Sequence, residues 1–199
     1  MWFVLFSLLM SLALPAAGCR SLRLVDTQSL DTSGMSYDAV QELKSQGISR
    51  SEVTEIAKAR QSGFSDADCI DAFKIFHSRQ QPFNAGGAIA SLVQVNVSHD
   101  AILELARINQ LGFDSGELQA MKLAGLSDDI LLEVARHRAN GQPVLSGASL
   151  AMLKNTGMRT STLLELARRG VPDSQGPAIV SYRRHGASDD EVLRRFAGL

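Results

Sequence analysis

The chain has 199 residues, 45% of them hydrophobic and 21% charged, and its formal net charge is -1. This composition is too apolar for a disordered chain and suits one globular domain or two small ones. The near-zero charge argues against a protein held to nucleic acid by a basic surface, because that affinity comes mainly from clustered Lys and Arg. Two cysteines exclude a disulfide scaffold, and four scattered histidines disfavour a multi-ligand metal site.

The N-terminal residues 1–18 carry no charge and contain an apolar run of roughly 14 residues, which is too short to cross a bilayer comfortably. The small residues Pro15-Ala16-Ala17-Gly18 close this run, as is typical of a cleavage site. The sequence therefore predicts a signal peptide over residues 1–18, although no Lys or Arg precedes the apolar run.

Cys19 follows the small residues directly. The stretch Leu14-Pro15-Ala16-Ala17-Gly18-Cys19 resembles the lipobox of bacterial lipoproteins, in which a small residue precedes a cysteine that is lipidated and becomes the new N-terminus. The resemblance implies that Cys19 carries acyl chains such as palmitate and tethers the protein to a membrane. Arg20 in the next position resembles the pattern sorted to the periplasmic side of the outer membrane. The alternative is an ordinary secretory signal cleaved after Gly18, which would leave Cys19 as a free or disulfide-bonded thiol.

Residues 20–37 are rich in Ser, Thr, Gln and Asp and poor in large apolar residues. A flexible chain of about 18 residues has a root-mean-square span of about 20–25 Å, so this segment would hold a folded part just off a membrane surface. We therefore expect three parts: a signal peptide over 1–18, a lipidated cysteine and tether over 19–37, and a helical repeat domain over 38–199.

The expected repeat domain resembles itself at an offset of 61 residues. The pentapeptide Leu-Glu-Leu-Ala-Arg occurs at 103–107 and again at 164–168, and the same offset relates Gly-Leu-Ser-Asp-Asp at 125–129 to Gly-Ala-Ser-Asp-Asp at 186–190. Two different segments that agree on one offset indicate a repeat array.

Each copy contains the signals of one helix ending and another beginning. Glycine takes the left-handed position after a helix at little steric cost, and a following Ser or Asp can cap the next helix. The glycines expected to end helices are Gly47, Gly63, Gly112, Gly125, Gly157, Gly170 and Gly186. The expected N-cap residues are Ser49, Ser65, Asp114, Ser127 and Ser188, with capping-box spacing at Ser49…Glu52, Asp114…Glu117 and Ser188…Glu191. We predict an all-α array of short helix-turn-helix repeats with about ten or eleven helices, arranged as two related units of about 61 residues.

Two sets of charged residues could be read as functional. The pairs Asp128-Asp129 and Asp189-Asp190 resemble acid–base carboxylates, but their place in a first helical turn favours a capping role. The pairs Glu104–Arg107, Glu133–Arg136 and Glu165–Arg168 lie three residues apart and are expected to form ion pairs on helix surfaces. The alternative for these pairs is a ligand groove lined by the arginines.

No assembled catalytic or metal-binding set is present among the motifs. His77 and His137 are expected near helix C-termini, and the sequence contains no His-x-x-x-His or Cys-x-x-Cys spacing. Cys69 is expected to be a small buried hydrophobe. We therefore predict neither a catalytic residue nor a metal or cofactor site.

Two segments interrupt the helical rhythm, residues 80–87 and 141–147, and each carries Pro and then Gly. They contain the apolar residues Phe83, Val144 and Leu145, which we predict as partner-binding residues, because exposed apolar side chains on the loops of a repeat array mark interaction sites. The alternative is that these side chains fold back and fill gaps between helices.

The function expected from these observations is a non-enzymatic binding or structural component of the bacterial cell envelope, tethered to a membrane and bound to a protein or another envelope component. The alternative is a soluble secreted domain. Its binding role would follow a weak resemblance of residues 101–135 to ubiquitin-associated modules, or of residues 47–53 to a helix-turn-helix. Nucleic acid is not an expected partner, and no enzymatic activity is predicted.

Overall fold

The computed structural model describes residues 25–112 and 115–198. These residues form twelve α-helices and one short 3-10 helix, with no β-strand among them, which confirms the predicted all-α class and adds one or two helices. In chain order the helices are α1 (Gln28–Thr32), α2 (Tyr37–Ser45), α3 (Arg50–Gln61), α4 (Asp66–Ser78), α5 (Gly86–Gln94), α6 (His99–Arg107), α7 (Ser115–Leu123), α8 (Asp128–Ala139), α9 (Gly147–Asn155), α10 (Thr160–Arg168), the 3-10 helix η1 (Asp173–Gln175), α11 (Gly176–Arg184) and α12 (Asp189–Phe196).

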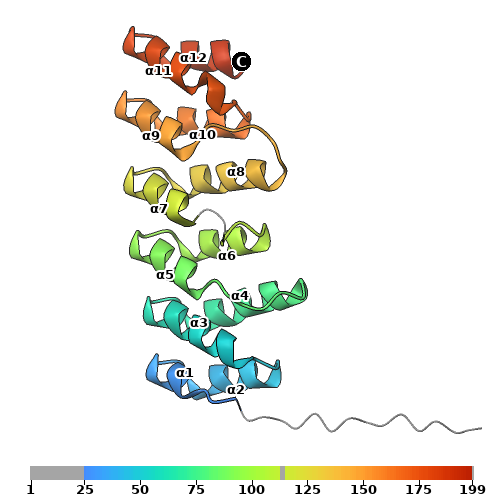
Figure 1. Ribbon diagram of the computed structural model, residues 1–199. Helices are drawn as coiled ribbons and strands as arrows, with labels where there is room; N and C mark the ends of the chain where they lie inside the picture. The colour runs from blue at the N-terminus through green and yellow to red at the C-terminus, as the bar shows by residue number, and fades with distance from the viewer. Residues whose placement is uncertain (1–24, 113–114, 199) are drawn as a thin grey trace, which may run out of the picture.

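The helices form two columns that rise together along one axis (Figure 1). Odd-numbered helices stack on one another in one column and even-numbered helices in the other, so that α3 packs on α5 and α4 on α6. Each odd-numbered helix and the even-numbered helix after it form a hairpin, and every hairpin contacts the next one along the chain. The molecule is therefore a solenoid of helical hairpins, in which packing is mainly between neighbours.

A continuous apolar core runs between the two columns. Side chains at helical spacing turn inward from both, and those that are completely buried include Leu43, Ile56, Phe73, Ile89, Ile102, Leu131, Leu150, Leu163 and Ile179. Burying such a side chain contributes about 1.5–3 kcal/mol. Each hairpin is too small to bury these residues alone, so stacking is what stabilises the helices.

Glycine in the left-handed conformation ends many of the helices. Gly47, with φ of 80°, follows α2, and the N–H groups of Gly47 and Ile48 donate to the carbonyls of Lys44 and Leu43, which satisfies the last turn. Five of the other predicted glycines also have positive φ, namely Gly63, Gly125, Gly157, Gly170 and Gly186. The exception is Gly112, because Asn109, with φ of 59°, takes this position after α6.

Serine side chains cap the start of several helices as predicted. Ser49 and Ser188 form complete capping boxes with Glu52 and Glu191. Ser127 occupies the N-cap position of α8, but its hydroxyl makes no capping hydrogen bond, so the predicted cap is present in position only. Asp114 lies outside the described residues.

The 61-residue offset corresponds to two hairpins. The N-cap residues of the even-numbered helices are Ser36, Ser65, Ser98, Ser127, Arg159 and Ser188. Their spacing alternates between 29 residues and 32 or 33, so the pattern returns every 61 or 62 residues. The six hairpins therefore make three such units in the described chain, one more than predicted.

Within residues 25–112 and 115–198, none of the helices combines the length and apolar character that crossing a membrane requires.

Candidate functional site

The aspartate that begins each of α4, α8 and α12 binds the preceding hairpin. Asp128 Oδ2 accepts the backbone N–H of Ser98, the N-cap of α6, at 2.9 Å, and Asp128 Oδ1 lies 2.5 Å from Lys122 Nζ. Burial alone would raise the pKa of Asp128, but the bonds from Lys122 and Ser98 outweigh it and lower the pKa below its ordinary value. This carboxylate is therefore a charged link between α6 and α8.

The same link recurs in the other two units of the stack. Asp66 accepts the N–H of Ser36 at 2.9 Å, and Asp189 accepts the N–H of Arg159 at 3.0 Å. The residue six positions before each aspartate is basic and binds the same carboxyl group: Arg60, Lys122 and Arg183. The repeat unit is thus defined by a bonding pattern as well as by its sequence.

Two of the three predicted Glu–Arg pairs form. Glu104–Arg107 and Glu133–Arg136 have N···O distances of 3.4 and 3.3 Å. Arg136 also lies 3.3 Å from Glu104, so the pairs join into a ladder across α6 and α8. These arginines are engaged by carboxylates, which leaves the ligand groove without support.

The third predicted pair, Glu165–Arg168, does not form. Arg168 instead lies 3.7 Å from Glu133 and extends the ladder to α10, while Glu165 binds Arg169 at 2.7 Å. Helix α8, the neighbour of α10 in the even-numbered column, offers Arg168 the carboxylate of Glu133. Packing between helices therefore overrides the spacing within one helix.

The histidines and the buried cysteine contribute to packing. His77 and His137 lie in the last turns of α4 and α8, as predicted. Cys69 is completely buried, and burial raises the pKa of its thiol to about 12, which makes it a small hydrophobe. Among the described residues no three His, Cys, Asp or Glu side chains gather in a way that could hold a metal ion.

Two of the three predicted partner-binding residues do not lie on the surface. Phe83 and Leu145 are 1% and 0% exposed, and Val144 is half-buried against the core. The ring of Phe83 packs edge-on against Phe76, with centroids 5.3 Å apart. The expectation that these apolar side chains are exposed is therefore wrong for Phe83 and Leu145, and the alternative, that they fill gaps between helices, describes both.

Glu52 holds the first of these loops in place. Its carboxylate is 3% exposed and accepts the backbone N–H of Phe83 at 2.8 Å, the N–H of Ser49 at 2.9 Å and the hydroxyl of Ser49 at 2.6 Å, and it lies 2.6 Å from His77 Nε2. Burial alone raises the pKa of Glu52, but these bonds together outweigh it and keep the pKa below its ordinary value. A buried carboxylate thus fixes the backbone of this loop at Phe83 against α3 and α4.

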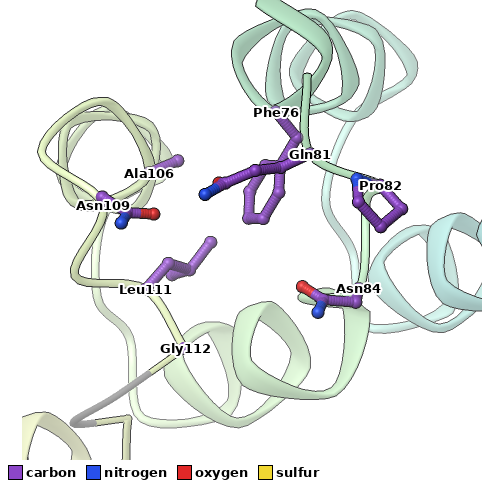
Figure 2. A pocket seen from close by; sticks show the side chains of 8 residues that line it. All are labelled: Phe76, Gln81, Pro82, Asn84, Ala106, Asn109, Leu111 and Gly112. Carbon is purple, nitrogen blue, oxygen red and sulfur yellow. The ribbon is translucent and has the colours of Figure 1, made fainter. Parts of the chain in front are cut away.

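A pocket of about 400 Å³ lies between this loop and the residues that follow α6. Figure 2 shows Phe76 and Leu111 facing each other across it, with the side chains of Gln81, Asn84 and Asn109 around them. Pro82, Ala106 and Gly112 complete the lining. Phe76 and Leu111 are 7% and 1% exposed, so they form an apolar floor, whereas the three amide side chains are exposed at the rim.

The polar groups of the pocket are amides and none of its lining residues is charged. The guanidinium of Arg79 lies 5.9 Å from the centre of the Phe76 ring and donates to Asn109 Oδ1 and to the carbonyl of Ala106. Asn109 therefore presents its NH₂ group. The side-chain amides of Gln81 and Asn84 make no hydrogen bond within the described residues and are free to both donate and accept.

The corresponding place between α8 and α10 is built differently. His137 stands where the offset would place Phe76, and it lies 3.1 Å from the carbonyl of Arg168. Gly170 stands where Asn109 would be, and a Cβ atom on it would lie 2.9 Å from the carbonyl oxygen of Pro143. The two segments approach closely there because glycine permits it, so the amide-lined pocket belongs to the unit that contains Asn109.

Sequence reasoning singled out residues 80–87 but selected Phe83 and missed Gln81, Asn84 and Asn109. The sequence contains little that points to these residues. An asparagine at the end of a helix, such as Asn109, predicts a residue in the left-handed conformation, but it does not predict that the side chain lines a pocket. Comparison with protein-family models, with curated proteins and with solved structures gives no match for this chain. The predicted lipidation site, Cys19, lies outside the described residues.

Proposed function

We propose that this chain is an exported, membrane-tethered helical repeat protein that acts as a non-enzymatic binding component of the bacterial cell envelope. In this proposal Cys19 carries the lipid anchor, the protein faces the periplasm from the outer membrane, and the solenoid holds a partner protein.

The pocket between α4 and α6 is the observation that carries the binding part of this proposal. Its apolar floor and amide rim suit an apolar side chain flanked by peptide groups, because Gln and Asn side chains can donate to and accept from a main chain. The lining residues are themselves uncharged, and the guanidinium of Arg79 beside them is engaged by Asn109 and Ala106, which favours a neutral segment over an acidic or basic one.

Site-specific photocrosslinking in cells tests the proposal. A photoreactive amino acid at Gln81 should crosslink to one defined partner. Gln142, the residue 61 positions later on an equally exposed loop, is the matched control and should give no such product. Equal products at both positions, or none at Gln81, would contradict the proposed site.

A further inference from the structure

Four odd-numbered helices share one length and one register. α5, α7, α9 and α11 are each nine residues long, and their second, sixth and ninth residues lie four and three positions apart, on one side of each helix. Eleven of these twelve residues are exposed, and Ser91 is half-buried. We call them the odd-helix face: Gly87, Ser91 and Gln94; Gly116, Ala120 and Leu123; Ala148, Met152 and Asn155; Pro177, Ser181 and Arg184.

This face differs in charge from the even-numbered column. Arg184 is the one charged residue among its twelve positions. The even-numbered helices carry the ladder of Glu104, Arg136, Glu133 and Arg168. Charged residues are depleted at the centre of protein interfaces, so the odd-helix face has the composition of a contact surface.

The odd-helix face carries both protruding apolar side chains and hollows. Three large apolar side chains are exposed in the described chain, and two of them, Leu123 at 72% and Met152 at 49%, belong to the odd-helix face. A hollow of about 210 Å³ lies between α7 and α9, lined mainly by small residues such as Ala120 and Ala148, with Glu117 and Met121 beside them. A second hollow of about 390 Å³ lies between α9 and α11, with Met152 in its wall.

We propose that the odd-helix face binds a second copy of this chain in a two-fold symmetric dimer. A two-fold contact places a patch against an identical patch, so a patch of one charge sign repels itself, whereas a nearly uncharged patch does not. It also requires projections and hollows on the same patch, which Met152 and Leu123 provide beside the two hollows. Methionine is suited to this because its flexible side chain adapts to the surface that it meets.

The first test is the mass of the purified full chain in density-matched detergent, measured by sedimentation equilibrium. The wild type should be a dimer. Met152→Lys and Leu123→Lys should each raise the dimer dissociation constant by about tenfold or more, because each buries a charge at the contact. Tyr37→Lys is the matched control, since Tyr37 is the third exposed large apolar residue, at 73%, and lies on α2, away from the face.

Far-UV circular dichroism spectra equal to that of the wild type would show that each variant keeps its fold, as expected for exposed positions. A wild type that stays monomeric would overturn the proposal and leave the face to another kind of partner. A dimer that Met152→Lys and Leu123→Lys leave intact would overturn it as well.

Disulfide trapping gives a second readout. Ala148→Cys, on the face, should form a covalent dimer on oxidation, whereas Ala139→Cys, exposed at the end of α8, should not. Equal yields from the two variants would contradict the proposed contact. Photocrosslinking at Gln81 reports on the α4–α6 pocket alone, so either proposal can fail without the other.

Discussion

At the scale of single residues, two adjacent carboxylates make different contacts. Asp128 and Asp129 both lie in the first turn of α8. Asp128 binds the N–H of Ser98 and the ammonium group of Lys122, whereas the carboxylate of Asp129 is exposed and forms no ion pair within the described residues. The sequence shows two carboxylates, and only the geometry of the preceding hairpin distinguishes them.

Asp128→Ala should lower the free energy of unfolding by about 1–2 kcal/mol, because it leaves a backbone N–H and a lysine without their acceptor. Asp129→Ala should change it by less than about 0.5 kcal/mol, as expected for a surface substitution. Urea denaturation of the two variants measures the difference. Equal effects would show that the link between α6 and α8 contributes nothing.

Glu52 should make stability depend on pH. Hydrogen bonds hold its pKa in the folded chain below the ordinary value, so its contribution is fully present above that value, about 4.3, and is lost as the pH falls through the folded pKa. Glu52→Gln should therefore reduce the loss of stability on acidification, measured by urea unfolding between about pH 3 and pH 7. An unchanged pH profile would contradict this role.

At the scale of helices, close backbone approach fixes how the odd-numbered column stacks. Gly86, the first residue of α5, is buried so tightly on α3 that a Cβ atom would overlap the backbone of Glu55. The next residue, Gly87, has open space around its Cα. One glycine is therefore required by packing, and its neighbour is not.

Gly86→Ala should destabilise the chain by about 1–3 kcal/mol, since helix α5 must shift to admit the methyl group. Gly87→Ala should be neutral or stabilising by up to about 1 kcal/mol, because alanine favours the helix. Chemical denaturation of both variants measures this. If Gly86→Ala is as stable as Gly87→Ala, the contact between α3 and α5 is looser than described.

The sequence was sufficient for the helices but not for the loops between them. Caps at Ser49 and Ser188, and glycines such as Gly47 and Gly157, are local signals that follow from backbone chemistry. Whether Phe83 is buried or exposed depends on the space beside α3 and α4. The pocket brings together Gln81, which follows α4, and Asn109, which follows α6. Such contacts come from stacking, and no periodicity within one helix encodes them.

At the scale of the whole molecule, the excess of acidic residues lies in the N-terminal half of the stack. Residues 25–100 contain 10 acidic and 6 basic residues, whereas residues 101–198, with 113–114 left aside, are nearly balanced with 10 acidic and 12 basic residues. If Cys19 is lipidated, the acidic end of the solenoid would lie nearer the membrane. The nearly balanced end would lie farther from it.

Cys19→Ser should move the protein from the membrane fraction to the soluble exported fraction, because the lipid is its only proposed anchor. Cell fractionation and incorporation of labelled palmitate measure this, and Cys69→Ala is the control, since Cys69 is a small apolar side chain buried in α4. Membrane retention of the Cys19→Ser protein with residues 1–18 still attached would mean that the apolar run is itself an anchor.

The central claim is that the α4–α6 pocket holds a segment of a partner protein. The most direct measurement is photocrosslinking in cells from Asn84, with and without Gln81→Trp, whose indole would fill the pocket. We expect the crosslinked product from Asn84 to be strong in the otherwise wild-type chain and to be lost when tryptophan occupies position 81. The unfolding temperature should stay unchanged. A product of equal yield in both chains would show that the partner binds elsewhere.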